Sequence, residues 1–364
     1  MPDRAPINFT RGVPADESYP LGELTEAAAA ALREQGAAAL RYGPATGFAP
    51  LRAWLAEWQG VAPEQVLIAN GSLQLIEFAC LAWLSPGDVV LTERPTYDRT
   101  LTILRRHGIR PVGVDVGPDG PDVDALEDVL RRERPKMFYV IPDFQNPSGA
   151  TCSRGKRERL VELAEAYDVL LLEDAPYRLL RYRGNDEPTL ASLAPQRTLH
   201  MTSFTKLLAP GVRMGFVVAP ADRIATLARV AEDTYISPAY LAHAIVHEWC
   251  RRGLLSPQIE RLKALYAPRL EACLGALDRH MPHAQATRPE GGFFLSLTLP
   301  EGVSTATVRA RAAERDLNLA DGQAFFPDGG GERFLRLSFC ALTPAEIDDG
   351  VARLAATVEA VRGV

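Results

Sequence analysis

The sequence predicts an α/β fold, with a large domain built on a mostly parallel sheet and a smaller α+β domain. Between about residues 45 and 220, short apolar runs alternate with helix-like stretches. Most of these runs are continuously apolar, which is typical of strands that helices cover on both faces. After Ala221 this alternation stops and long helical stretches begin, so a second domain is expected.

Seven apolar runs are predicted as strands of the large domain. They are Val66–Ala69, Val89–Thr92, Val112–Asp115, Met137–Ile141, Val169–Glu173, Leu199–Thr202 and Phe216–Ala219. The helix-like stretches between them are Ser72–Leu84, Tyr97–His107, Val123–Arg132 and Arg154–Tyr167. Strand, helix and strand at this spacing favour parallel pairing, with ligands at the carboxyl ends of the strands.

The second domain is predicted from a different mixture of elements. Helical stretches at about 222–280 precede a strand at Phe293–Thr298, a helix near Ser304–Arg315, a strand near Phe334–Phe339 and a last helix from Pro344. The length of 364 residues fits about two domains of roughly 150 residues. We expect residues 1–44 to belong to the small domain, 45–265 to form the large domain and 266–364 to complete the small one.

Composition excludes several classes of protein. Hydrophobic residues make up 47% and charged residues 24%, which is typical of globular proteins. The net charge of −6 gives no drive toward nucleic acid or an anionic membrane. The five cysteines are scattered without a C-x-x-C pair, so neither a disulfide framework nor a zinc ribbon is expected. With no signal peptide and no apolar membrane span in the sequence, the expected location is cytoplasmic.

Polar residues stand directly after four of the predicted strands. The strand that ends at Glu173 is followed by Asp174 and Tyr177, and a carboxylate there can be buried facing a ligand. The strand that ends at Thr202 is followed by Ser203, Thr205, Lys206 and Arg213. A lysine crowded by a cation seven residues later is a candidate for a lowered pKa and a nucleophilic amine.

The other two strand ends carry amides and a helix start. Asn146 lies in a turn-rich segment after Met137–Ile141, and Gly71, Ser72 and Leu73 begin a helix after Val66–Ala69. Backbone N–H groups at such a helix start bind phosphate. Taken singly, these motifs are ordinary turns, helix caps or a solvated surface lysine. Their joint occurrence in one α/β region indicates one site.

Three further segments complete the pattern, namely Arg41–Arg52, Glu93–Tyr97 and Phe334–Ser338. The whole pattern resembles the class I and II aminotransferases, which are pyridoxal-phosphate enzymes of fold type I. The pattern is most similar to the branch with aminoadipate and kynurenine aminotransferases, and it extends from Asn8 to the last helix. The resemblance implies pyridoxal 5'-phosphate as cofactor, an L-α-amino acid and a 2-oxo acid as substrates, and a homodimer with shared active sites. It implies no nucleic-acid or membrane partner.

The resemblance also implies roles for individual residues. Lys206 forms the Schiff base with the cofactor aldehyde and moves the Cα proton of the substrate. Asp174 pairs with the pyridine nitrogen and keeps it protonated, so that the ring acts as an electron sink. Tyr97 stacks on the ring, and Asn146 and Tyr177 hydrogen-bond its hydroxyl oxygen.

Phosphate and substrate have their own expected residues. The phosphate is held by the Gly71, Ser72 and Leu73 backbone together with Ser203, Thr205 and Arg213, and Tyr42 reaches it from a neighbouring subunit. Arg336 binds the substrate α-carboxylate with its two-pronged guanidinium. The other expected substrate-binding residues are Asn146, Gly12 and Arg11.

Departures from the family pattern leave the substrate open. The chain starts only a few residues before Ile7, Arg11 replaces a small residue, Leu73 a frequent glutamine, and Asp143 a Ser or Asn. Arg11 would suit an acidic distal group, whereas a cationic group such as a guanidinium would suit Asp16, Glu17, Asp98 and Asp143. An alternative function is elimination, replacement, cyclisation or oxidation at Cβ or Cγ of a basic amino acid, with the same cofactor and fold, in a biosynthetic pathway.

Two other kinds of function are weighed against the enzyme. An amino-acid sensor behind a DNA-binding domain needs a helix-turn-helix, for which residues 1–20 leave no room. His243 and His247 have the i, i+4 spacing of metal ligands, but the glutamate of a metalloprotease motif and a third ligand are missing from the sequence. We therefore expect no metal.

Overall fold

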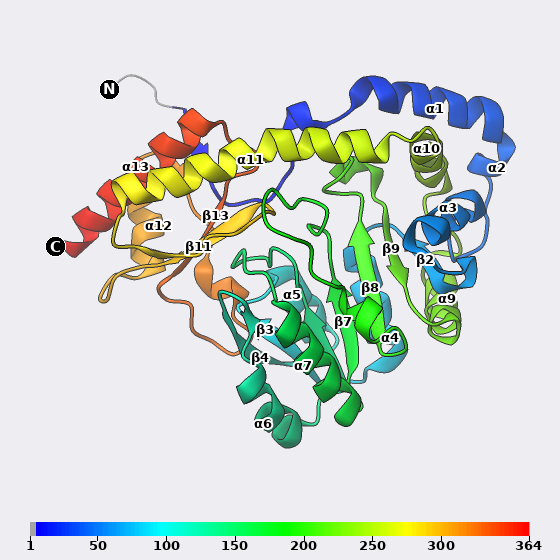
Figure 1. Ribbon diagram of the computed structural model, residues 1–364, viewed down its shortest axis with the longest axis horizontal. Helices are drawn as coiled ribbons and strands as arrows, with labels where there is room; N and C mark the ends of the chain where they lie inside the picture. Colours follow the sequence, from blue (N-terminus) through cyan, green and yellow to red (C-terminus); the bar gives the residue numbers. More distant parts are fainter. Residues whose placement is uncertain (1–4, 364) are drawn as a thin grey trace.

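The fold is built around one large sheet. The computed structural model describes residues 5–363, and there this sheet has eight strands in the order β2-β9-β8-β7-β6-β3-β4-β5 (Figure 1). The strands are β2 (Val66–Ala69), β3 (Val89–Arg94), β4 (Arg110–Gly117), β5 (Gly120–Pro121), β6 (Met137–Val140), β7 (Leu170–Asp174), β8 (Thr198–Ser203) and β9 (Gly215–Val218). All seven predicted strands are present, so the α/β prediction is confirmed.

The directions of the strands decide where a ligand can bind. β3 is parallel to β4 and β6, and β6, β7 and β8 are parallel in turn. β9 is antiparallel to both of its neighbours, so β2 runs in the same direction as β8. The carboxyl ends of β2, β3, β6, β7 and β8 therefore meet at one edge of the sheet, and the segments that follow them lie close together.

Helices cover the sheet on both faces, as the continuous apolar runs predicted. They are α4 (Ser72–Trp83), α5 (Asp98–Arg106), α6 (Val123–Glu133), α7 (Arg154–Ala166), α8 (Leu190–Leu193) and α9 (Ala221–Tyr235). Within β6, Tyr139 belongs to the apolar cluster under α4 and α9, whereas Phe138 belongs to the cluster under α6 and α7. Alternate residues of a strand point to opposite faces, so a strand covered on both sides must be apolar throughout.

The C-terminal part is a smaller unit with its own core. Its elements are β10 (Gln285–Ala286), β11 (Phe294–Thr298), α12 (Thr305–Ala313), β12 (Leu317–Asn318), β13 (Phe334–Ser338) and α13 (Pro344–Arg362). The strands β10, β11 and β13 form an antiparallel sheet, and β12 pairs with β1 (Ile7–Asn8). Ile7 and Phe9 pack in the same core as Leu337 and Leu354. The two ends of the chain thus build one unit.

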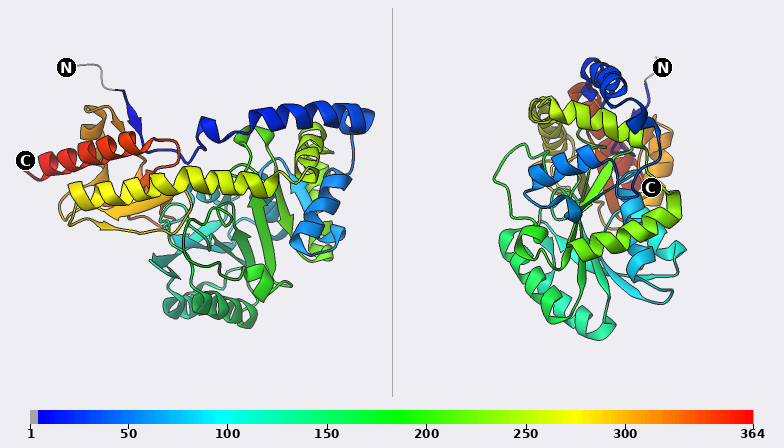
Figure 2. Two further views of the ribbon diagram at one scale, coloured as in Figure 1. Left: turned by 45° about the horizontal axis from the view of Figure 1, so that its top comes forward. Right: turned by 90° about the vertical axis from the view of Figure 1, so that its right-hand side faces the viewer.

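Helices connect this unit to the large sheet. They are α1 (Leu21–Gln35), α2 (Ala37–Leu40), α3 (Ala49–Gln59), α10 (Tyr240–Arg251) and α11 (Leu255–His280). Figure 2 shows β1 and α13 at one end of the molecule and α1 at the other. There α1 packs against α10, with Ala27 and Trp249 in a common core. The predicted domain boundary at 265 falls inside α11, which is continuous there. The domain boundaries at 44 and 265 stay a prediction.

The helices of the described chain were also compared with the dimensions of a bilayer. Among residues 5–363, no helix combines the length and the apolar character needed to cross a membrane.

Candidate active site

A cavity lies at the carboxyl edge of the large sheet, where the five parallel strand ends meet. Every predicted cofactor-binding residue except Tyr42 lines it. The lining residues are Gly71, Ser72, Leu73, Tyr97, Ile141, Asn146, Asp174, Pro176, Tyr177, Ser203, Thr205, Lys206 and Arg213. Ile141 and Pro176 are additions that the motifs did not indicate. The shared strand direction explains why segments up to 142 residues apart in sequence reach one cavity.

Asp174 is the buried acid of this cavity. It is the last residue of β7, and its Oδ2 accepts a hydrogen bond of 2.7 Å from the hydroxyl of Tyr139. Within the described residues, its other oxygen, Oδ1, has no hydrogen-bond partner. Burial raises the pKa of Asp174 to about 6, against the lowering effects of the Tyr139 hydrogen bond and the charges of His200 and Lys206. The carboxylate is therefore ionised at neutral pH and has an oxygen free for a donor.

Lys206 lies opposite, in the loop after β8. Its Nζ donates a hydrogen bond of 2.6 Å to the carbonyl of Gly12 and lies 5.8 Å from the ring centre of Tyr177. The pKa of Lys206 is lowered to about 8, chiefly by burial and also by the charge of Arg336, against the raising effects of Cys340 and Asp174. A larger share of neutral amine is then present near neutral pH than on an exposed lysine, as a nucleophile requires.

The wall formed by α4 is built to hold an anion. Gly71 caps α4 with φ +101°, and a Cβ there would lie 2.6 Å from Nη2 of Arg213. Arg213 donates from the same nitrogen to the carbonyl of Asn70 at 2.9 Å. Ser203 donates to Thr205 Oγ1 at 2.8 Å. A helix N-terminus, a guanidinium and two hydroxyls thus converge, which is the donor set that a phosphate takes.

Asn146, in the cavity wall, and Arg336, which bonds to it, form a second polar group. Arg336, on β13, donates to Asn146 Oδ1 at 2.8 Å and to the carbonyl of Thr10. Its guanidinium carbon lies 4.6 Å from the ring centres of both Phe294 and Phe325. Among the described residues its Nε has no hydrogen-bond partner. The two rings hold the guanidinium plane in place, so its edge can bind a carboxylate.

The remaining predicted residues lie in different places. Tyr97, at the start of α5, is partly buried in the cavity wall, and burial raises its pKa to about 12. Gly12 lies against Phe294, where a Cβ would come within 2.2 Å of the ring. Arg11 is exposed, and its carbonyl accepts a hydrogen bond from Ser338. Tyr42 is 79% exposed and does not reach the cavity of its own chain.

The acidic residues that were candidates for binding a cationic substrate do not line the cavity. Asp143 is 1% exposed and paired with Arg157 at 2.8 Å, and Glu17 is paired with Arg269. The described lining residues include neither of them, nor Asp16 or Asp98. Arginines of this chain pair with both carboxylates, and a substrate cation at Asp143 or Glu17 stays a prediction without support from this geometry.

Some residues of the site have no distinctive motif. Tyr139 holds Asp174 but stands in an apolar strand, where its ring looks like an ordinary core residue. Phe294 and Phe325 both contact Arg336. Phe294 belongs to the strand β11 and Phe325 to a short helical turn before β13, so the sequence does not indicate that they lie together. The polar hydroxyl in an otherwise apolar run was the one available signal for Tyr139.

The two histidines at helical spacing lie away from the cavity. His243 is fully buried on α10, where burial lowers its pKa to about 4, and burial also lowers the pKa of His247. In the part of the chain that the structure describes, no cluster of three or more histidine, cysteine or acidic side chains is arranged to hold a metal.

Comparison with known proteins places this chain in a large group. A family model described as aminotransferase class I and II matches residues 4–354. The 2-aminoadipate transaminase of Thermus thermophilus is 40% identical over 96% of this chain and 89% of its own length. Aromatic-amino-acid aminotransferase 1 of Thermococcus litoralis is 32% identical over 97% and 88%.

Solved structures agree with these relatives. The α-aminoadipate aminotransferase of Thermus thermophilus, complexed with N-(5'-phosphopyridoxyl)-L-leucine, is 38% identical and superimposes with a TM-score of 0.94, covering 98% of this chain and 93% of the other. A kynurenine aminotransferase from Pyrococcus horikoshii is 30% identical, with a TM-score of 0.95 and coverages of 98% and 92%.

The pKa of Lys206 gives a testable prediction. In the chain freed of cofactor, we expect Lys206 to react with an aldehyde at a rate that rises with pH and is half-maximal near 8, because only the neutral amine attacks. Reductive labelling followed by mass spectrometry of the Lys206 peptide measures this rate. The control is the same peptide in urea-unfolded chain, where a lysine titrates near ~10.4. Equal pH profiles in the two states would contradict the lowered pKa.

Proposed function

The chain belongs to the class I and II aminotransferases, and from this membership we propose which residues carry the reaction and which substrates it uses. The protein transfers an amino group between an L-α-amino acid and a 2-oxo acid with pyridoxal 5'-phosphate as cofactor. When bound, this cofactor supplies an electron sink for the carbanion at the substrate Cα. The alternative of elimination, replacement, cyclisation or oxidation is not favoured, since these relatives are named aminotransferases.

Two features of the cavity fit this cofactor. The free oxygen of Asp174, without a partner among the described residues, matches the protonated nitrogen of a pyridine ring. The cradle of Gly71 and Arg213 leaves no room for a Cβ and matches a phosphate. We base the proposal chiefly on Asp174, because a buried carboxylate with one unpaired oxygen is costly unless a cation binds it.

Each residue then has a proposed task. Lys206 holds the cofactor covalently and, once released, moves the proton at the substrate Cα. Tyr97 covers one face of the ring and helps to exclude water. Asn146 and Tyr177 orient the ring by donating to its hydroxyl oxygen. Arg336 binds the substrate α-carboxylate, with its guanidinium held between two aromatic rings.

The role of Asp174 leads to a mutational prediction. We expect Asp174→Asn to lower kcat by about 100-fold or more, because a neutral amide no longer stabilises the ring cation on which the electron sink depends. Cofactor content, measured by absorbance after alkaline release, should fall far less. The control is Asp168→Asn, an exposed carboxylate just before β7 that pairs with Arg197. An Asp174→Asn enzyme with wild-type kcat would refute the assignment.

We also propose that the substrates are amino acids with neutral or acidic side chains. Two of the carboxylates that would attract a cationic side chain are occupied by arginines of the chain itself. The relatives are named for 2-aminoadipate, aromatic amino acids and kynurenine. Neither these carboxylates nor the names of the relatives therefore support a substrate with a basic side chain.

A substrate panel tests this proposal. The holoenzyme is mixed separately with glutamate, 2-aminoadipate, leucine, phenylalanine and arginine, and the 2-oxo acids are identified by mass spectrometry. We expect kcat/KM for the first four to exceed that for arginine by about tenfold or more, the value of one lost charge pair. A clear preference for arginine, or a cyclised or dehydrated product, would contradict the proposal.

We further propose a homodimer in which Tyr42 acts on the partner's cofactor. The supporting observation is that Tyr42 is 79% exposed and that Leu40, two residues before it on α2, is 66% exposed. Large apolar side chains left exposed in this way are typical of surfaces that bind another protein. A cytoplasmic location remains a proposal as well, supported by five buried free cysteines.

Mixed dimers test the Tyr42 proposal. Tyr42→Phe should weaken cofactor binding by about tenfold or more, because it removes a hydrogen bond to a charged group. When Tyr42→Phe and Lys206→Ala chains are co-expressed, we expect each hybrid dimer to regain one complete site and about half the wild-type activity. Matched homodimers of each variant are the controls. A hybrid whose remaining Lys206 site binds the cofactor as weakly as the Tyr42→Phe homodimer does would show that Tyr42 does not act across subunits.

A further inference from the structure

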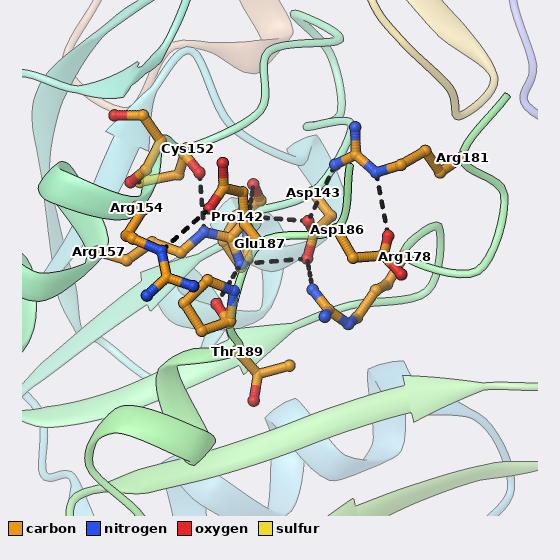
Figure 3. A network of polar contacts seen from close by, with 12 residues as sticks. Pro142, Asp143, Cys152, Arg154, Arg157, Arg178, Arg181, Asp186, Glu187 and Thr189 are labelled. Carbon is orange, nitrogen blue, oxygen red and sulfur yellow. Dashed lines mark hydrogen bonds and ion pairs between the residues drawn. The ribbon is translucent and has the colours of Figure 1, made fainter. Parts of the chain in front are cut away.

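Asp143 is buried among three arginines next to the active site. It lies in the loop after β6, three residues before Asn146, and is 1% exposed. Its two oxygens lie 2.8 Å from Arg157, 3.2 Å from Arg178 and 3.9 Å from Arg181. Figure 3 shows Arg157 on one side of the carboxylate and the other two arginines opposite. One buried carboxylate thus joins three separate parts of the chain.

Arg157 anchors the loop that carries Asn146. It projects from α7, is fully buried, and donates to the carbonyls of Pro142 and Cys152, each at 2.8 Å. A further bond of 2.9 Å reaches the carbonyl of Pro188, near the end of the loop between β7 and α8. Besides its ion pair with Asp143, this guanidinium therefore fixes both ends of residues 142–152.

Arg178 and Arg181 bring in the segment that carries Tyr177. Arg178 is the next residue after Tyr177, and Arg181 stacks on Phe144 with 4.7 Å from its guanidinium carbon to the ring centre. Asp143 therefore contacts, through these arginines, the segment of Tyr177, while its own loop carries Asn146. The two proposed donors to the ring hydroxyl oxygen are linked through one carboxylate.

The charges of the cluster balance without any ligand. Arg181 also pairs with Asp186 at 3.1 Å and with Glu290 at 2.6 Å. Together with Asp143, these carboxylates offset the three guanidinium groups. Among the described residues, Asp143 does not line the cofactor cavity. The charge of Asp143 is neutralised by arginines of the protein itself. Replacing Asp143 by a neutral residue would leave Arg157 buried without its carboxylate partner.

We propose that Asp143 is a positioning residue that holds Asn146 and Tyr177 at a fixed separation, so that both reach one oxygen of the bound cofactor. Two donors can converge on one atom only if their loops keep their relative position to within about 0.5 Å. A second tie supports the same loop from the other side, since Gln145 donates to Glu93 at 3.1 Å and to the carbonyl of Pro95 at 2.7 Å. The inference rests on the proposed roles of Asn146 and Tyr177.

The test is a pH titration of the visible absorption of the bound cofactor. Hydrogen bonds to the ring oxygen stabilise its ionised form and so favour loss of the proton from the lysine–cofactor link. In the Asp143→Asn holoenzyme we expect the midpoint to rise by about 0.5 to 1 pH unit, because looser loops weaken those bonds. Asp186→Asn, which removes an exposed partner of Arg181, is the matched control and should leave the midpoint and kcat unchanged.

Steady-state kinetics separate positioning from substrate binding. We expect Asp143→Asn to lower kcat and to change KM for glutamate and for arginine by the same factor. A rise in KM confined to arginine would overturn the proposal, because it would place Asp143 against the substrate. A lower melting temperature with an unchanged midpoint would overturn it too, because it would make the cluster a fold element alone.

A second variant keeps the test decisive if Asp143→Asn fails to fold. Arg178→Gln leaves the buried pair of Asp143 and Arg157 intact and removes the shorter of the two ion pairs that join Asp143 to the Tyr177 segment, the longer one being to Arg181. We expect the same upward shift of the midpoint in this variant, and an unchanged midpoint would overturn the proposal.

Direct variants of the two donors separate this inference from the proposed function. Asn146→Ala and Tyr177→Phe should each raise the midpoint. If neither does, the proposed roles of these residues fail. If both do and Asp143→Asn and Arg178→Gln do not, the positioning inference alone is wrong.

Discussion

The structure depends on a buried carboxylate, Asp174, at the carboxyl end of a central strand. Removing a carboxylate from water is costly, and the chain offsets that cost in part with the hydroxyl of Tyr139. One carboxylate oxygen is left without a hydrogen-bond partner among residues 5–363, so it is available to a cationic donor in the cavity. Parallel neighbouring strands then place the other polar segments around the same point. The direction of the strands therefore explains why polar segments from distant parts of the sequence gather around this one charge.

Net charge and local charge differ in this protein. The chain carries −6 overall, yet Lys206, Arg213 and Arg336 surround the cavity or its mouth. This excess of positive charge matches a phosphate and an α-carboxylate, which are both anions. By contrast, the cluster around Asp143 is neutral within itself. The charged groups around the cavity are thus available to bind ligands, whereas the charged groups around Asp143 are paired with one another.

The sequence predicted the sheet and the cavity well, for a physical reason. Strands covered on both faces must be apolar throughout, and polar residues at their carboxyl ends stand out against such runs, as Asp174 and Lys206 do. Contacts that depend on tertiary packing left no such signal. In the sequence, Tyr139 looks like a core residue. Nothing next to Asp143 indicates that it is paired, because its arginines lie up to 38 residues away in sequence. The packing of α1 on α10 was equally invisible, because an alanine-rich helix face fits many partners.

A short N-terminal segment contacts both Arg336 and Lys206. Arg336 donates to the carbonyl of Thr10, and Lys206 donates to the carbonyl of Gly12. The segment follows β1, which pairs with β12, so the C-terminal unit anchors its start. In the proposed roles, a substrate carboxylate would compete for the donors of Arg336, and the cofactor would take the amine of Lys206. The two hydrogen bonds that these ligands would replace thus end on carbonyls only two residues apart, in one short segment.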